Sequence, residues 1–292
     1  MKLNKKYLLA SGCSYTEGHK LGNESAWPKF LGEELGLEVI NLAKGGSGNE
    51  WIVQDTISYS TLNLDIAKNS LFVIQLSECL RHLVHFDLIP NSYGDLTKEG
   101  RYYNITPGLF LGQGGFLTDD RPTGWNDDAL HRTIQKGSKY LVHFYCNITF
   151  ALLKTYWNII NFVNFCEGNN YSYLIFDGIN NHIPYKKDEK WYLSGSGDYE
   201  KYEIVVEETD NLKEFIKQEQ SPILLYDLIE YIKDLKYYHN SPTLHSFITT
   251  DRDDGLNSDY HEGNQGHPNE LGAKMWAKHL VKVLQEKFDE IK

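Results

Sequence analysis

A near-continuous apolar run, LFVIQL, occupies residues 71–76 and indicates the class of fold. Strands of this composition are buried on both faces, as happens in parallel sheets that have helices on either side. Shorter apolar runs at residues 7–11, 39–42 and 173–177 predict further strands. Segments with helical spacing separate these runs, and the alternation predicts a parallel sheet of about five strands with right-handed crossovers.

The helical segments are recognised by apolar residues that recur on one face. They cover residues 25–35, 49–59, 144–165, 224–235 and 268–288. Ser25 is expected to cap the first of these helices, and Gly36 is expected to end it. Asn49 is interpreted either as the cap of the second helix or as a donor to a ligand. The last helix is predicted to begin at Pro268 or Asn269.

We interpret residues 1–292 as one domain, because α/β folds of this length commonly form a single core. Two segments interrupt the alternation of strands and helices. Residues 87–138 are rich in Gly, Tyr and Trp, and residues 186–220 are polar and charged. Long segments of this kind are usually lids or binding loops, so both are predicted to be insertions that shape a pocket. Their aromatic side chains either line a substrate groove or pack the loops.

Composition excludes several classes of function. The formal net charge of −11 disfavours binding to nucleic-acid backbones. The sequence contains no stretch of about 18 consecutive apolar residues, so no transmembrane helix is expected. The apolar run at residues 7–10 is too short for a signal peptide. We therefore expect a cytoplasmic protein whose four cysteines are free thiols. The sequence indicates no oligomeric state.

Three short motifs carry the chemistry. The tripeptide GCS at residues 12–14 follows the first predicted strand, so Ser14 is expected at the carboxyl edge where α/β sheets bind ligands. A glycine-rich segment, residues 41–49, follows the second strand and offers backbone N–H groups to a developing oxyanion. His267 is held by Pro268 in front of the last helix, which gives it the fixed direction that a general base needs.

In this order and at these positions, the three motifs resemble those of the SGNH/GDSL hydrolases across nearly the whole chain. The resemblance implies a three-layer α/β/α sandwich with a parallel five-stranded sheet of the flavodoxin-like type. It also implies Ser14 as nucleophile, the N–H of Gly46 as an oxyanion donor and His267 as general base, with no cofactor. The Gly-Cys-Ser turn is similar to that of divergent members common in bacteriophage genomes, which would allow a virion-associated protein.

Two positions depart from the pattern of that family. No Asn follows the third strand in the oxyanion position, and Ser77 or Arg81 is predicted to replace it as a donor. Near the last motif the family has an Asp, whereas this chain has the amides Asn264 and Gln265. Either one of these amides, Asn264 or Gln265, orients His267, or an acid of the same loop does so, or a Ser–His dyad acts alone. The acids of that loop are Asp254, Asp259 and Glu262.

The resulting prediction is a serine esterase that forms a covalent acyl-enzyme on a small-molecule or glycan ester, with a small acyl group on a carbohydrate as the favoured case. Three alternatives stay open. The first is an acyltransferase that uses the same site, and the second is an SGNH-fold binding or structural module that has lost catalysis. The third is a virion or host-interaction protein that binds glycans through the aromatic insertions. No metal is predicted, because the His and Asp residues around His267 match no standard ligand spacing. Asp177, which ends the fourth strand, either lines the same crevice or has a structural role in a turn.

Overall fold

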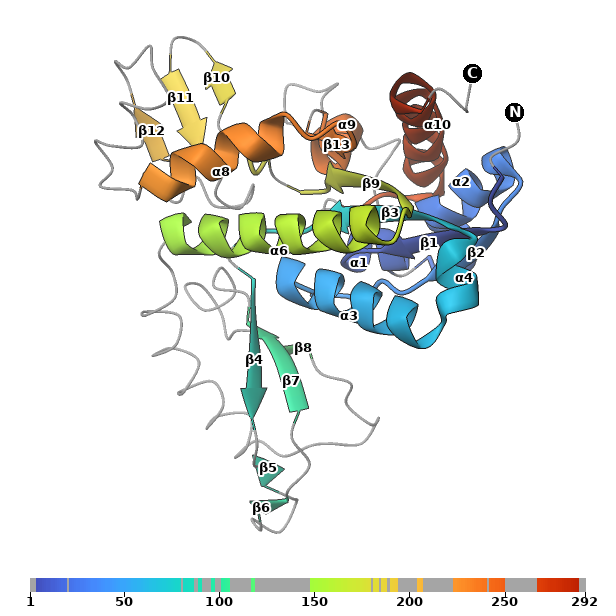
Figure 1. The fold of residues 1–292 in the computed structure, drawn as a ribbon, viewed down its shortest axis with the longest axis horizontal. Helices are drawn as coiled ribbons and strands as arrows, with labels where there is room; N and C mark the ends of the chain where they lie inside the picture. Colours follow the sequence, from blue (N-terminus) through green and yellow to red (C-terminus); the bar gives the residue numbers. More distant parts are fainter. Residues whose placement is uncertain are drawn as a thin grey trace.

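The computed structural model describes most of the chain in separate ranges (Figure 1). These are residues 4–19, 21–79, 81–86, 89–90, 96–97, 101–105, 117–118, 148–179, 181–183, 185–187, 190–193, 204–206, 223–240, 242–249 and 267–288.

The centre of the molecule is a five-stranded sheet in which all neighbouring strands are parallel. Its strands are β1 (Tyr7–Ser11), β2 (Glu38–Asn41), β3 (Ser70–Leu76), β9 (Ser172–Asp177) and β13 (Tyr238–His239). They lie in the order β13-β9-β3-β1-β2. When the five strands are numbered along the chain, this is the order 2-1-3-4-5 of flavodoxin-like folds, read from the other edge. The predicted parallel sheet and its flavodoxin-like type are confirmed.

Helices cover both faces of this sheet (Figure 1). On one face lie α2 (Trp27–Leu35), α9 (Leu244–Thr249) and α10 (Glu270–Lys287). On the other face lie α3 (Asn49–Leu62), α4 (Leu64–Lys68), α6 (Ile148–Gly168) and α8 (Ile223–Lys233). The three-layer α/β/α sandwich that the resemblance implied is therefore the architecture of the chain.

Alternation of side chains along the strands divides the core into two layers. In β3, Leu71 and Val73 pack under α2 and α10, whereas Phe72 and Ile74 pack under α3 and α6. All of β3 is buried, because its side chains point alternately to the two helical layers. This is the burial that the apolar run LFVIQL predicted.

Helix starts are where the structure differs from the sequence-based expectation. Ser25 is not the cap of α2, because it ends a 3-10 turn (Asn23–Ser25), and Ala26 takes the extended cap conformation instead. Asn49 is the first residue of α3, with Gly48 in the cap position. The cap of α10 agrees with the prediction, since the side chain of Asn269 accepts a hydrogen bond from the N–H of Gly272.

Smaller antiparallel sheets lie in and beside the two predicted insertions. One is formed by β4 (His82–Phe86), β7 (Arg101–Ile105) and β8 (Leu117–Thr118), and it extends away from the helical layers (Figure 1). A two-stranded sheet joins β5 (Ile89–Pro90) to β6 (Leu96–Thr97). Another sheet joins β10 (Tyr185–Lys187), β11 (Lys190–Leu193) and β12 (Ile204–Val206). In the part of the chain that the structure describes, no helix combines the length and apolarity needed to cross a membrane.

Candidate active site

The nucleophile turn begins directly after β1. Gly12 and Cys13 lead into α1 (Ser14–Glu17), a single helical turn with Ser14 as its first residue. A side chain at Gly12 would be impossible here, because its Cβ would lie 2.3 Å from Thr16 Oγ1 and 2.8 Å from Gln75 Oε1. The close approach of these two side chains to the backbone therefore requires glycine before the serine.

A buried hydrogen-bond network holds this turn against the sheet. Thr16 Oγ1 donates to Gln75 Oε1 at 2.6 Å and accepts from the indole N–H of Trp27 at 3.1 Å. Gln75 Nε2 lies 3.3 Å from the Cys13 sulfur. Thr16, Gln75, Trp27 and Cys13 are all fully buried, so the position of Ser14 is fixed by β3 and α2 together.

The structure brings Ser14 and His267 together, although 253 positions separate them in the sequence. His267 Nε2 lies 2.9 Å from Ser14 Oγ, which is hydrogen-bond distance. Two residues, the buried Pro268 and the capping Asn269, separate His267 from the start of α10 at Glu270. Because α10 packs extensively on α2, the imidazole is carried by a firmly held helix start.

Two rings lie against the imidazole of His267. The ring of Tyr15 is 4.8 Å from it between centroids, and the ring of His19 is 4.7 Å from it, each tilted by about 35°. Tyr15 is buried and its hydroxyl lies 3.1 Å from Nδ1 of His245, whereas His19 is exposed. These ring contacts restrict the orientation of the imidazole. They carried no motif signal in the sequence, apart from the closeness of residues 15 and 19 to Ser14.

The glycine-rich loop after β2 packs beside the nucleophile. A Cβ on Gly45 would lie 3.9 Å from Ser14 Cβ and 2.8 Å from Glu17 Oε2. The N–H of Lys44 donates to the carbonyl of Gly12 at 3.2 Å, which joins the loop to the end of β1. Gly46 adopts φ of +78°, a left-handed conformation that favours glycine. The structure therefore places the predicted oxyanion loop next to Ser14.

Beyond β3, the two predicted replacement donors differ in their surroundings. The backbone N–H of Ser77 donates to the side chain of Asn49 at 2.7 Å, and its own side chain is fully buried. Arg81 Nε donates to Glu78 Oε2 at 2.8 Å. Burial lowers the pKa of the Arg81 guanidinium, but the nearby Glu78, Cys13 and Tyr15 together raise it above its usual value. Arg81 therefore lies near enough to Cys13 and Tyr15 of the nucleophile turn to interact with them electrostatically.

The predicted orienting groups Asn264 and Asp259 lie outside the described residues, as do the other acids of that loop. Among the described residues, no group of three or more His, Cys, Asp or Glu side chains is arranged to hold a metal ion.

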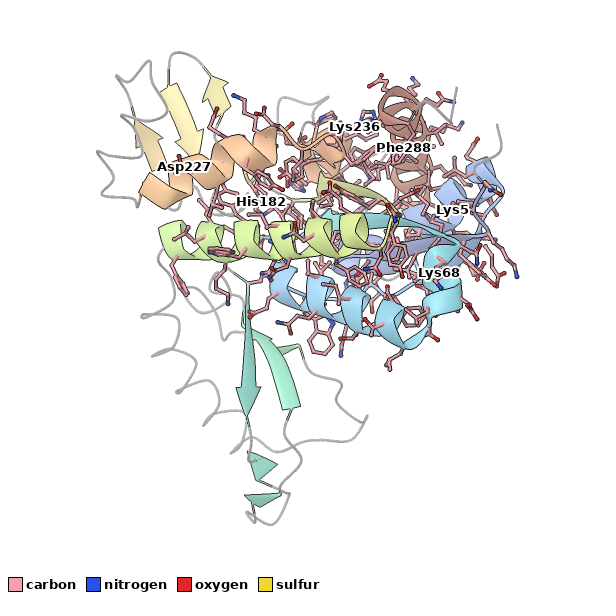
Figure 2. All side chains as sticks on the ribbon, viewed as in Figure 1. Lys5, Lys68, His182, Asp227, Lys236 and Phe288 are labelled. Atoms are coloured by element: carbon pink, nitrogen blue, oxygen red, sulfur yellow. The ribbon has the colours of Figure 1, made fainter. Side chains whose placement is uncertain are left out.

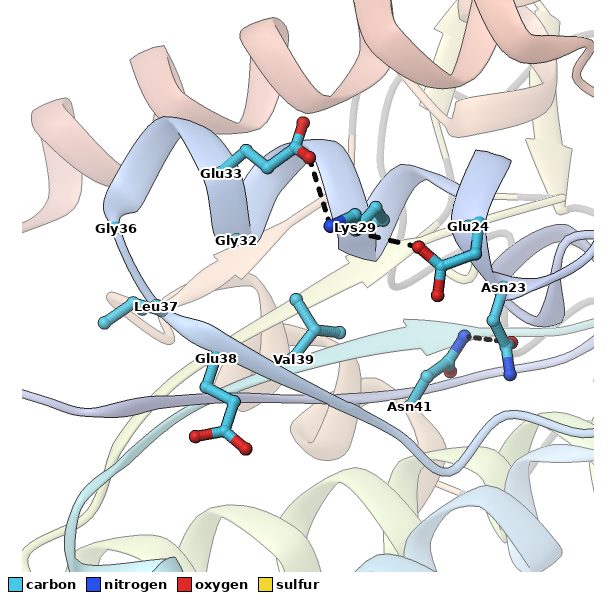
Figure 3. Close-up of a pocket in the computed structure, with 10 residues that line it drawn as sticks. All are labelled: Asn23, Glu24, Lys29, Gly32, Glu33, Gly36, Leu37, Glu38, Val39 and Asn41. Atoms are coloured by element: carbon cyan, nitrogen blue, oxygen red, sulfur yellow. Dashed lines mark hydrogen bonds and ion pairs between the residues drawn. The ribbon is translucent and has the colours of Figure 1, made fainter.

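A cavity of about 520 Å³ lies between α2 and the edge strand β2, and neither Ser14 nor His267 lines it (Figure 3). Its lining is polar: Lys29 forms ion pairs with Glu33 at 3.1 Å and with Glu24 at 3.9 Å, and Asn41 donates to Asn23 at 3.2 Å. These lining side chains already pair with one another. The cavity therefore does not compete with the Ser14–His267 pair as the candidate site.

No protein-family model matches the sequence, and no curated protein sequence matches it. Solved structures are similar to this chain over nearly its whole length. A lipolytic protein of the G-D-S-L family from Desulfitobacterium hafniense is 14% identical, with 96% of this chain and 100% of that chain covered and a TM-score of 0.44. TesA is 11% identical, with 97% and 100% covered and a TM-score of 0.48. The psychrotrophic esterase EstA from Pseudoalteromonas sp. is 10% identical, with 97% and 98% covered and a TM-score of 0.44.

Proposed function

We propose that this protein is a serine esterase in which Ser14 is the nucleophile and His267 the general base. The observation that carries the proposal is the 2.9 Å contact between Ser14 Oγ and His267 Nε2 at the carboxyl edge of the parallel sheet. Nucleophile and base within hydrogen-bond distance are the signature of covalent acyl transfer. The same contact favours an active enzyme over a module that has lost catalysis.

In the proposed reaction, His267 Nε2 accepts the hydroxyl proton while Ser14 Oγ bonds to the carbonyl carbon of the ester. The tetrahedral intermediate then collapses, the bond to the alcohol oxygen breaks, and the imidazolium returns its proton to that oxygen. A water molecule, deprotonated by His267, then attacks the acyl carbon. The bond between that carbon and Ser14 Oγ breaks, the imidazolium returns the proton to Oγ, and the carboxylic acid leaves. The rings of Tyr15 and His19 keep the imidazole aligned through these proton transfers.

The carbonyl oxygen becomes negatively charged in both steps, and hydrogen-bond donors must face it. We assign this role to the backbone N–H groups of Ser14 and Gly46 and to the guanidinium of Arg81. The hydroxyl of Ser77 and Nη1 of Arg81 are both buried without a hydrogen-bond partner among the described residues, although the backbone N–H of Ser77 already donates to Asn49. We favour Arg81, because its positive charge complements the developing oxyanion.

The substrate we propose is a small acyl ester, with an acylated carbohydrate as the favoured case. Strand β4 begins at His82, one residue after Arg81, so the aromatic-rich segment 87–138 follows the candidate site closely in the sequence. Aromatic faces of Tyr and Trp provide flat apolar surfaces for binding small molecules. This placement supports a role for that segment in substrate binding.

The test compares wild type and Ser14→Ala on p-nitrophenyl acetate and on acetylated xylo-oligosaccharides, with release of acetate as the readout. We expect wild-type turnover on both substrates and none with Ser14→Ala. Addition of an alcohol acceptor distinguishes hydrolysis from transfer, because a transferase would form the new ester faster than free acetate. Wild-type activity that persists in Ser14→Ala would overturn the assignment of the nucleophile.

A further inference from the structure

A chain of buried polar side chains that the proposed reaction does not use lies beneath the candidate oxyanion site. It begins at Asp177, the last residue of β9, which is fully buried. Asp177 Oδ1 lies 2.6 Å from Nδ1 of His182 and accepts from the hydroxyl of Tyr238 at 2.7 Å, and its Oδ2 accepts from the N–H of His182 at 3.0 Å. The carbonyl of His182 accepts from the hydroxyl of Tyr156 in α6. His182 is therefore fixed on several sides inside the molecule, beside α6 (Figure 2).

The chain continues from His182 to Asn49, the first residue of α3. Nε2 of His182 lies 3.4 Å from Nδ2 of Asn49. Nδ2 of Asn49 also donates to the hydroxyl of Thr155 in α6 at 3.2 Å. With its proton on Nδ1, the imidazole donates to Asp177, and its Nε2 shares with Thr155 the Asn49 N–H that does not donate to the carbonyl of Ser77. The amide of Asn49 is consequently held in one orientation.

The oxygen and the other N–H of the Asn49 amide pair with the backbone at the end of β3. Its Oδ1 accepts from the N–H of Ser77 at 2.7 Å, and its Nδ2 donates to the carbonyl of Ser77 at 3.2 Å. One residue earlier, Gly48 packs against Arg81 so closely that a Cβ on Gly48 would lie 2.6 Å from the Arg81 carbonyl oxygen. The segment that carries Gly46 is thus fixed against the segment that carries Arg81 by two adjacent contacts.

We propose that Asn49 is a positioning residue that sets the distance between the two segments supplying the oxyanion donors, and that Asp177 and His182 hold it in place. This inference rests on the proposed function, because Gly46 and Arg81 matter only if Ser14 attacks a carbonyl. Donors that act on the developing oxyanion affect the transition state more than substrate binding. Loss of Asn49 therefore lowers kcat and leaves KM nearly unchanged.

The experiment measures p-nitrophenyl acetate turnover and the rate at which a fluorophosphonate probe labels Ser14, for wild type, Asn49→Ala and Ser60→Ala. Ser60 is the matched control: it is also fully buried in α3, and its hydroxyl donates to the carbonyl of Thr56 in the same helix. Small displacements of catalytic groups cost up to about 10²-fold in rate. We expect Asn49→Ala to lower kcat and labelling by about tenfold to a hundredfold, with KM within about twofold of wild type. Ser60→Ala is expected to match wild type.

A second pair of variants separates positioning from folding. His182→Gln retains one donor for Asp177 and one acceptor for Asn49, whereas His182→Ala removes both. We expect labelling to be slow in His182→Ala and to recover toward the wild-type rate in His182→Gln, with thermal melts recorded for all variants. If Asn49→Ala does not fold, the labelling rates of His182→Ala and His182→Gln test the positioning role in its place.

The outcomes distinguish the two proposals. A wild type that is labelled at Ser14, together with folded Asn49→Ala or His182→Ala proteins that are labelled equally fast, overturns the positioning role and leaves the esterase proposal intact. A folded wild type that is neither labelled nor active overturns the esterase proposal, and the positioning role fails with it.

Discussion

Replacement of Thr16 by Val removes one hydroxyl from the interior of the nucleophile turn and changes the side-chain volume little. That hydroxyl donates to Gln75 Oε1 at 2.6 Å and accepts from Trp27 Nε1 at 3.1 Å, in a fully buried setting. A buried polar group that loses its partner costs about 1–3 kcal/mol. In this variant the Trp27 N–H and the Gln75 oxygen each lose a hydrogen-bond partner, although the Cys13 thiol remains 3.6 Å from the Gln75 oxygen. We therefore expect Thr16→Val to lower the free energy of unfolding by about 2–4 kcal/mol.

Urea unfolding followed by circular dichroism measures this loss. With a slope of about 3 kcal/mol/M, the unfolding midpoint moves down by about 1 M urea. Thr56→Val is the matched control, because Thr56 is equally buried but its hydroxyl donates to the carbonyl of Ile52 within α3. The control is expected to move the midpoint by less than about 0.5 M. Equal shifts in the two variants, or none in Thr16→Val, would refute the reasoning that the bonds of Thr16 hold the turn.

Three further predictions concern stability and the donor loop. Gly46→Ala places a side chain at φ +78°, which is expected to cost about 1–2 kcal/mol in urea unfolding and to slow probe labelling of Ser14; an unchanged labelling rate would count against Gly46 as a donor. Asn269→Ala removes the cap of α10 and is expected to cost about 1 kcal/mol, most of which Asn269→Ser restores, as thermal melts will show. Burial, with His279 and Lys287 nearby, lowers the pKa of His239 from 6.5 to about 4. Since the unfolded chain binds this proton more readily, the contribution to stability is complete above pH 6.5 and is lost as the pH falls toward 4. His239→Gln is expected to flatten the fall of the urea midpoint across that range, and an unchanged slope would contradict the assignment.

The main elements of the fold were predictable because each carries a strong local pattern. The all-buried strand β3 and the capped helix α10 are both long and regular in sequence. Strand β13 was not predicted, since it consists of Tyr238 and His239 alone and is defined by pairing with Ile175 and Phe176 of β9. A two-residue edge strand leaves no periodic pattern, so its existence depends on tertiary contacts. The wrong cap of α2 has a similar origin, because the turn before it uses Ser25 as a helical residue.

In the candidate site, too, residues within local sequence motifs were predictable, and residues placed by tertiary contacts were not. Ser14, the glycine-rich loop and His267 were singled out because each follows a strand or precedes a helix in a recognisable order. The role of Asn49 could not be foreseen, because its partners Ser77 and His182 are 28 and 133 positions away. The sequence left Asn49 as a helix cap or a ligand donor, and the structure shows it pairing with backbone instead. Contacts at such separations are set by the packing of α3, β3 and β9, which no motif records.

Intact mass after incubation with a fluorophosphonate probe tests the central claim most directly, with Ser14→Ala and His267→Ala measured alongside. We expect one adduct on the wild type and none on either variant, because the serine hydroxyl reacts only when the imidazole 2.9 Å away accepts its proton. A folded wild type that gains no adduct, or an adduct that persists in Ser14→Ala, would contradict that claim.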